Sequence, residues 1–181
     1  MGQIRKPAPV KLVIGLLTGR RELFDQVQRL LEERFGPADL VSPLLDFTQT
    51  DYYAAEFGPR LVREFLTFER LIDPADLAGI KVWTNGLEDQ LAHGERRRIN
   101  LDPGYISLSK LVLASTKNHS HRIYIGQGIY AEITLRYYKK AFRPWEWTYP
   151  DYASDTYREL FQEIRERYMQ QLRLSGNQSP E

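Results

Sequence analysis

The chain has 181 residues with 42% hydrophobic and 27% charged content, which suits a folded chain with its own core and excludes disorder over most of its length. Its 25 basic and 24 acidic residues give a net charge of +1, so no global field attracts nucleic acid or anionic lipid. The absence of cysteine excludes disulfides, thiolate zinc sites and cysteine nucleophiles. No apolar run approaches the roughly 20 residues of a membrane helix and no signal-peptide core follows Met1, so we expect a cytoplasmic protein without a membrane segment.

The two ends of the chain differ from its middle in composition. Residues 1–10 include Pro7 and Pro9 and predict an extended lead-in. Residues 174–181 have almost nothing apolar to bury and predict a disordered tail. No internal repeat divides residues 11–173, which we interpret as a single α+β domain.

Hydrophobic periodicity predicts the first elements. Residues 12–17 form a short apolar run rich in β formers, which indicates a strand. Apolar residues recur at helical spacing over residues 21–35 and predict a helix that Gly36 ends. Residues 41–47 and 61–72 predict two further strands. A Gly-Pro pair between them is typical of a chain reversal, so we expect an antiparallel pair.

A second helix and a fourth strand complete the first half of the chain. Asp73 followed by proline marks a helix start, and apolar residues at spacings of three and four predict a helix to about His93. Residues 97–101 predict a strand that ends at a turn over residues 102–104. The order is strand, helix, strand, strand, helix, strand. This is the ferredoxin-like order, a two-layer sandwich with both helices on one face of an antiparallel sheet.

The remaining chain extends this core. Residues 108–116 fit either a short helix or a buried strand, and the pattern leaves both open. Residues 122–137 show the clearest β alternation, with a turn or bulge at residues 126–128. Its predicted apolar face carries Ile129, Ala131, Ile133, Leu135 and Tyr137. An aromatic linker, residues 143–150, leads to a helix from about Asp151 that we expect to pack on the sheet. The predicted fold is α+β, a ferredoxin-like sheet extended by a C-terminal β-hairpin and helix.

Several ordered motifs together resemble a bacterial family known as domain of unknown function 4416. They are Lys11 to Leu17, Asp46-Phe47-Thr48, Asp51-Tyr52-Tyr53, Phe65 to Glu69, Thr84-Asn85, Leu87-Glu88, Asn100 to Tyr105, Lys110 to Lys117, His121 to Tyr124, Gly128 to Glu132, and Trp147 to Tyr152. The resemblance covers about residues 8–172, with a short insertion at Gln49-Thr50 and Phe57 in place of methionine. It implies no catalytic residues, although members are sometimes labelled GTP-binding.

Nucleotide and metal motifs can be tested against the residues present. A P-loop, Gly-x-x-x-x-Gly-Lys-Ser/Thr, does not occur in the sequence. The two glycines of residues 126–128 lie between strands, which excludes a dinucleotide fingerprint and favours a bulge. His119 and His121 have ligand spacing for a divalent metal if the segment is extended. We favour the other interpretation, a polar turn that leads into a strand.

Six carboxylates lie in or beside predicted strands: Asp46, Asp51, Glu56, Glu69, Asp102 and Glu132. Two of them close together would separate in pKa and act as acid and base, or would hold Mg²⁺, the cofactor that we consider. The alternative is that arginines neutralise them. Under it, Glu69 pairs with Arg63 or Arg70, and Glu132 with Arg136 or Arg122.

The first functional hypothesis is a small-molecule binding domain or enzyme whose ligand is a nucleotide or another phosphorylated compound. Its site is the polar strand face over residues 130–136, next to the aromatic linker. Asp102 and Glu132 would be the catalytic acid, base or metal ligands. The ligand-binding residues would be Lys110, Arg122, Tyr130, Arg136, Trp147 and Tyr149. This hypothesis requires Asp102, Glu132, Lys110 and Arg122 to meet in one pocket.

The second hypothesis is a non-catalytic interaction module. Basic and aromatic residues alternate over residues 136–152, which would dock RNA or a protein partner through stacking and phosphate contacts. The net charge near zero argues against strong nucleic-acid binding. This hypothesis requires a flat, exposed strip from Arg136 to Trp147. The sequence does not indicate an oligomeric state.

Overall fold

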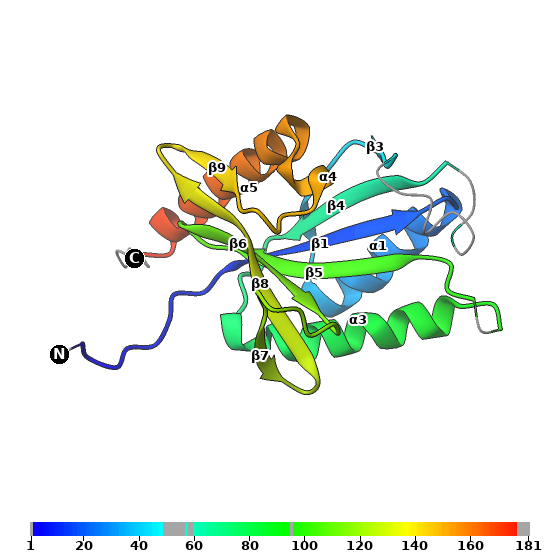
Figure 1. Ribbon diagram of the computed structural model, residues 1–181, viewed down its shortest axis with the longest axis horizontal. Coiled ribbons are helices and arrows are strands. Elements are labelled where there is room, and N and C mark those ends of the chain that lie inside the picture. The colour runs from blue at the N-terminus through cyan, green and yellow to red at the C-terminus, as the bar shows by residue number, and fades with distance from the viewer. Residues whose placement is uncertain (1, 49–56, 58–59, 95, 177–181) are drawn as a thin grey trace.

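A computed structural model describes residues 2–48, 57, 60–94 and 96–176 (Figure 1). The elements of its first half are β1 (Lys11–Thr18), α1 (Glu22–Phe35), β2 (Ala38–Val41), β3 (Leu45–Asp46), β4 (Val62–Phe68), a 3₁₀ turn η2 (Pro74–Asp76), α3 (Leu77–Leu91) and β5 (Asn100–Ile106). Those of its second half are β6 (Lys110–Ser115), β7 (Ile123–Gly126), β8 (Ile129–Tyr138), β9 (Ala141–Pro144), α4 (Pro150–Ala153) and α5 (Asp155–Leu174). None of the helices in the described ranges combines the length and the apolar composition that crossing a membrane requires.

One antiparallel sheet of nine strands organises the molecule. Its order is β2-β4-β1-β5-β6-β8-β7, with β3 also paired to β4 and β9 to β8. The predicted order of elements in the first half is confirmed except that the single strand expected over residues 41–47 is two short strands, β2 and β3. Both pair antiparallel with β4, as expected for that segment. The ambiguous segment, residues 108–116, contains strand β6 rather than a helix. The sheet is larger than the four strands of a simple ferredoxin-like core.

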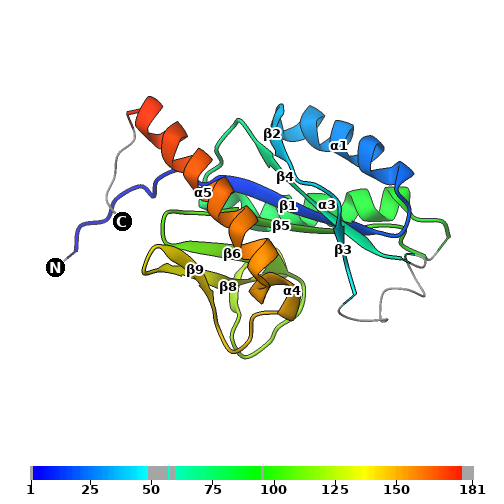
Figure 2. The ribbon, with the colours of Figure 1, turned by 90° about the horizontal axis from the view of Figure 1, so that it is seen from above.

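Helices cover both faces of the sheet, so the prediction of two layers is wrong. All eight residues of β1 are buried. Leu12 and Ile14 face α1 and α3, whereas Val13 packs in a second core with residues of α5. In Figure 1, α5 lies above the sheet and α1 and α3 lie below it, and Figure 2 shows α5 crossing over the strands. A strand without polar alternation needs cover on both sides, and α5 provides the second cover.

The predicted turn at residues 102–104 is also wrong, because β5 continues through it to Ile106. The register pairs Pro103 with Ile14 and Gly104 with Val13 of β1. A Cβ atom at position 104 would lie 2.3 Å from the carbonyl oxygen of Val112 on β6. Glycine therefore lets the backbones of β5 and β6 approach closely at this point.

Strands β5 and β6 diverge on the N-terminal side of Gly104 and form a fork in the sheet (Figure 1). Their pairing is limited to Gly104, Tyr105 and Ile106 on β5. On β5 the backbone groups of alternate residues point to the same side. The N–H of Leu101 donates to Glu88 (2.7 Å) and its carbonyl accepts from Lys81 (2.7 Å), so α3 satisfies the groups that β6 leaves unpaired. Pro103, the next residue on that side, has no N–H to satisfy.

A bulge in β8 divides the apolar face that the sequence predicts for that strand. Leu135 pairs with Leu111, but Ile133 pairs with the next residue, Val112, so Thr134 is the additional residue. Before the bulge, Ala131 packs with residues of α3, and after it Leu135 packs in the core under α5. Ile133 is 42% exposed, whereas Glu132 and Thr134 are buried. Simple alternation fails here because the bulge exchanges the two faces.

Candidate functional site

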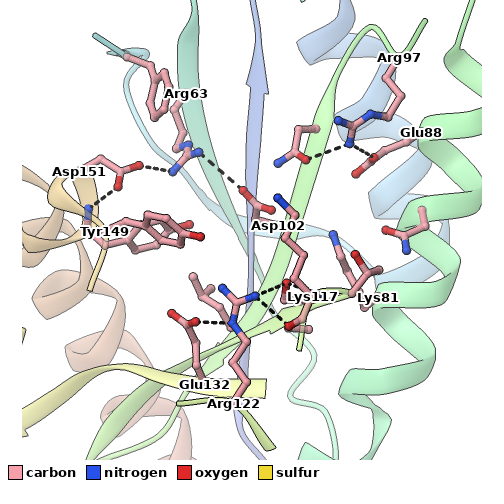
Figure 3. A pocket seen from close by; sticks show the side chains of 18 of the residues that line it. Arg63, Lys81, Glu88, Arg97, Asp102, Lys117, Arg122, Glu132, Tyr149 and Asp151 are labelled. Atoms are coloured by element: carbon pink, nitrogen blue, oxygen red, sulfur yellow. Dashed lines mark hydrogen bonds and ion pairs between the residues drawn. The ribbon is translucent and has the colours of Figure 1, made fainter. Parts of the chain in front are cut away.

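A cleft of about 880 Å³ occupies the fork between β5 and β6. Side chains from four parts of the fold line it (Figure 3). The first part is the central sheet, with Asn100 and Asp102 on β5 and Arg63 on β4, and the second is residues 113–117 at the end of β6. The third part is α3, with Lys81, Asn85, Glu88 and Asp89, and the fourth is residues 149–152 around α4. Arg122 and Glu132 close one end of the cleft. The cleft exists because β5 and β6 separate beyond their three paired residues. Side chains of α3 and of the segment around α4 line the space that this separation leaves.

Arg63 is the charged centre of one wall. Its side chain is 5% exposed and its Nη1 lies 2.6 Å from Oδ2 of Asp151, while Nη2 lies 3.6 Å from Oδ2 of Asp102. The guanidinium also lies over the rings of Phe47 (4.9 Å) and Tyr152 (5.4 Å). Burial acts to lower the pKa of Arg63, but Tyr152, Asp102 and Asp151 outweigh it and the pKa is raised. Arg63 therefore stays cationic in the wall.

Asp151 reaches Arg63 from the first turn of α4, which Pro150 opens. Its Oδ1 accepts a hydrogen bond from the N–H of Tyr152 (2.9 Å). Burial raises the pKa of the Asp151 carboxyl, and Arg63 offsets part of that rise. Burial likewise raises the pKa of the Tyr152 hydroxyl well above its ordinary value. The hydroxyl of Tyr152 is therefore a neutral donor at physiological pH.

The α3 wall carries two buried charged residues seven positions apart, which places them on one helix face. Lys81 is 7% exposed and Glu88 is 4% exposed. Oε2 of Glu88 accepts from Nη1 of Arg97 (3.3 Å) in addition to its bond with Leu101. Burial raises the pKa of Glu88, and Lys81 opposes that rise. Both residues brace the open side of β5.

The opposite end of the cleft is a charged network around Glu132. Its Oε2 lies 2.7 Å from Nε of Arg122 and 3.0 Å from Nε2 of His121, and its Oε1 accepts from Thr134 (3.2 Å). Arg122 also donates to Oγ of Ser115 (2.8 Å) and to a carbonyl of the following loop. With three side chains bound to it, Glu132 is fixed in place.

The structure brings four of the eight predicted site residues to this cleft: Asp102, Glu132, Arg122 and Tyr149. The other four, Lys110, Tyr130, Arg136 and Trp147, do not line it. Lys110 and Arg136 lie opposite each other at the far end of β6 and β8. Trp147 donates to the carbonyl of Ile133 (3.1 Å), and the ring of Tyr130 packs against Tyr124 (5.4 Å). The predicted convergence of Lys110 with Asp102 is therefore wrong, because the fork and the bulge separate the two regions.

Two of the expected ion pairs have different outcomes. The pairing of Glu132 with Arg122 is confirmed. The pairing of Glu69 with Arg63 is wrong, since Arg63 binds the two aspartates instead. Two other carboxylates considered in the sequence, Asp51 and Glu56, lie outside the described residues, as does the insertion at Gln49-Thr50.

The histidine pair is engaged in stacking rather than spread for coordination. The rings of His119 and His121 lie 5.9 Å apart and 8° from parallel, and His121 is bound to Glu132. Within the described ranges, no group of three or more histidine and acidic side chains is arranged to hold a metal ion. The segment enters β7 through a turn, which agrees with the polar-turn interpretation.

Sequence reasoning missed Arg63, Asp151, Lys81 and Glu88. A signal for the last two exists, since they are charged residues on the buried face of a helix whose other buried positions are mainly apolar. Arg63 and Asp151 are 88 positions apart, and no local pattern in the sequence connects them.

Comparisons with known proteins bear on the family alone. No curated protein matches the chain, and no solved structure does either. A family model described as a domain of unknown function (DUF4416) matches residues 8–168, which include every element that lines the cleft. The chain belongs to this family.

Proposed function

We propose that the cleft binds a small phosphorylated compound, with nucleotides as the first class to test. The observation that carries this proposal is the state of Lys81. Its ammonium group is buried, donates a hydrogen bond to the carbonyl of Leu101 (2.7 Å), and lies within ion-pair distance of no carboxylate among the described residues. Glu88 acts on Lys81 only from beyond ion-pair distance, so the buried ammonium keeps hydrogen-bonding capacity that the oxygens of an anionic ligand would use.

Other groups in the same walls are hydrogen-bond donors without acceptors. Nε of Arg63 and the hydroxyl of Tyr152 are buried and have no hydrogen-bond partner in the described part of the chain. No carboxylate or amide oxygen among the described residues of the cleft wall is buried without a partner in this way. A surplus of donors favours a ligand rich in acceptors, and phosphate is such a group.

The size and the rim of the cleft agree with a nucleotide-sized ligand. Its volume of about 880 Å³ falls within the range of roughly 300–1,000 Å³ that is typical of small-molecule sites. Tyr149 lines the rim and is 50% exposed, which leaves ring surface for a base or sugar to pack on.

We further propose that Asp102 is the acid or base if the bound compound reacts. Its side chain is 28% exposed, and its nearest cation, Arg63, is 3.6 Å away, which is longer than a hydrogen bond. Its oxygens therefore remain available to a proton, to a ligand hydroxyl or to Mg²⁺. Glu132, by contrast, is held by three side chains, so its role in this proposal is to orient Arg122.

The scaffold suggests which part of the fold is common and which is particular to this site. We infer that β1 to β5 form a ferredoxin-like unit, supported by the strand order β2-β4-β1-β5 and by the packing of α1 and α3 on one face. Strands β6 to β9 and helices α4 and α5 are added to that unit, and the cleft lies where the two parts meet.

Thermal-shift measurements with nucleotides, phosphosugars and inorganic phosphate, each with and without Mg²⁺, test the proposal. A ligand at 100 times its Kd stabilises the folded state by about 2.7 kcal/mol, which raises the Tm of a chain this size by roughly 5–10 °C. Lys81→Met should abolish the ligand-induced shift. Lys110→Gln, which changes a lysine outside the cleft, should leave it intact. If no compound shifts the Tm at millimolar concentration, or if Lys81→Met keeps the full shift, the proposal is wrong.

A further inference from the structure

The β8–β9 hairpin and the adjacent start of β6 carry a cluster of cations that lies outside the cleft. We name it the hairpin patch and define it as Lys110, Arg136, Lys139, Lys140 and Arg143. The hairpin lies beside α5 in Figures 1 and 2. None of the five residues forms an ion pair within the described part of the chain. The patch therefore presents uncompensated positive charge.

Three of these cations form a row across three strands. Arg136 on β8 lies directly opposite Lys110 on β6 and directly opposite Arg143 on β9. Directly opposite residues in antiparallel strands point to the same face with their Cβ atoms about 5 Å apart. Like charges in such positions destabilise a sheet. Folding alone gives no reason to place three cations in this row.

The turn between β8 and β9 also carries positively charged residues at positions where other residues would be more stable. Lys139 and Lys140 form the two-residue loop between the paired Tyr138 and Ala141, with φ values of 50° and 62°. Positive φ at both central residues is the type I′ turn, which favours Asn-Gly because side chains such as lysine are strained there. The turn therefore keeps two lysines in a conformation that other residues adopt more readily.

Aromatic rings lie between these cations. The guanidinium of Arg136 sits 4.3 Å above the ring of Trp145 and 5.5 Å from that of Tyr138, and Nζ of Lys139 is 5.5 Å from the Tyr138 ring. Tyr138 is 53% exposed. Cations interleaved with an exposed ring suit a chain that offers phosphates and flat bases in alternation. A lipid surface instead favours apolar side chains that insert, and the rings of this patch are flanked by charge.

We propose that the hairpin patch binds single-stranded RNA. Lys110, Lys139, Lys140 and Arg143 contact phosphates, and Tyr138 with Arg136 provides a surface on which a base stacks. This function is independent of the ligand proposed for the cleft. The near-neutral net charge of the chain implies binding of moderate affinity that depends strongly on salt.

Fluorescence anisotropy with a labelled 15-nucleotide oligouridine RNA at 50 mM salt tests this proposal. We expect the triple variant Lys110→Gln, Lys139→Gln, Lys140→Gln to bind at least about tenfold more weakly, and its plot of log K against log salt to be less steep by about 2. A matched variant, Arg21→Gln, Arg29→Gln, Arg173→Gln, has the same net charge but changes exposed positions in or directly before helices α1 and α5. It should bind as the wild type does, and so should the cleft variant Lys81→Met.

A second variant separates binding from folding. Lys139→Asn with Lys140→Gly installs the preferred type I′ turn, so it should raise the Tm while it weakens RNA binding. If this variant has a higher Tm but binds the RNA as tightly as the wild type does, the two lysines do not contact RNA and the proposal is wrong. Two further results would overturn it as well: no binding by the wild type at 50 mM salt, or binding to phosphatidylserine vesicles without binding to the RNA.

Discussion

Buried ionisable side chains are concentrated around the cleft, and their partners come from distant parts of the chain. Arg63 on β4 joins Asp102 on β5 to Asp151 on α4. Removing one member of such a set leaves the others as uncompensated charge, which costs more than the pair contributes. The ion pairs therefore hold the charged side chains of the cleft wall in fixed positions, while the space between them is open to a ligand.

One buried carboxylate outside the cleft predicts a pH dependence of stability. Glu64 on β4 is 8% exposed, and its Oε2 has no hydrogen-bond partner in the described ranges. Burial, with a smaller effect of Asp25, raises its pKa to about 7. The folded state then binds more protons than the unfolded state between pH 4.5 and pH 7, so this group's contribution to stability falls as pH rises through that window.

Glu64→Gln should remove that contribution. We expect the variant to be more stable than the wild type at pH 7, by up to about 3 kcal/mol, and similar to it near pH 4.5. Urea unfolding at both pH values measures the difference. Glu33→Gln, at an exposed position of α1, is the control and should follow the wild type. Equal stability of Glu64→Gln and the wild type at pH 7 would contradict the assignment.

Local pairs could be predicted from the sequence, and distant ones could not. Glu132 on β8 and Arg122, directly before β7, are ten positions apart, and Arg122 was one of the two partners expected for Glu132. The Arg63 pair with Asp151 depends on how α4 folds back over the sheet, which no periodicity encodes. The sequence also identified Asp102 as a candidate, and of the partners assigned to it Glu132 and Arg122 line the same cleft, whereas Lys110 does not.

At the scale of elements, periodicity predicted most helices and strands. In β5, local turn signals led to the wrong prediction that the strand ends at residue 101. Pro103 and Gly104 are typical turn residues, yet both lie inside a strand. Proline is tolerated there because its missing N–H falls on the side that β6 leaves unpaired. Tertiary context overrides the local signal where the sheet divides.

Gly104→Ala tests the close approach of the two strands. The new Cβ would lie 2.3 Å from a backbone oxygen of Val112, which cannot move without displacing β6. We expect the free energy of unfolding to fall by roughly 3 kcal/mol. Gly86→Ala, within α3, has no atom within 4 Å of the new methyl group and should be stabilising by up to about 1 kcal/mol. Urea denaturation of both variants measures their free energies of unfolding. Similar values for the two would contradict the close approach of β5 and β6 at Gly104.

At the scale of the whole molecule, Lys11 connects the edge of the sheet to the last helix. It is fully buried and donates to Asp39 on β2, to the carbonyl of Phe68 on β4 (2.6 Å) and to Gln171 on α5 (2.9 Å). All three ammonium hydrogens therefore have acceptors. Three segments that are far apart in the sequence meet at this one nitrogen atom.

Lys11→Met should lower the free energy of unfolding by about 3 kcal/mol, because Asp39 loses its counter-ion and Gln171 its partner. Lys6→Met, at an exposed position of the lead-in, provides the matched control and should leave stability unchanged. Thermal and urea unfolding of the two variants provide the comparison. A Lys11→Met protein as stable as the control would show that Lys11 does not hold α5 to the sheet.

The general class of the fold was accessible from the sequence, but the number of layers was not. Alternation and helical spacing were enough to predict an α+β chain with an antiparallel sheet. The continuous apolar run of β1 carried the information that both faces are covered, since all its residues are buried. The position of α5 on the second face depends on long-range packing, including Phe161 against Phe65 (5.2 Å).

The fork also determines how the two parts of the sheet are joined. Strands β5 and β6 share three residue pairs, whereas β1 shares seven with β5 and six with β4. Amide hydrogens along this short central seam should therefore exchange with solvent sooner than those of β1. A compound bound in the cleft would contact both arms of the fork, so its presence should slow exchange on β5 and β6 together.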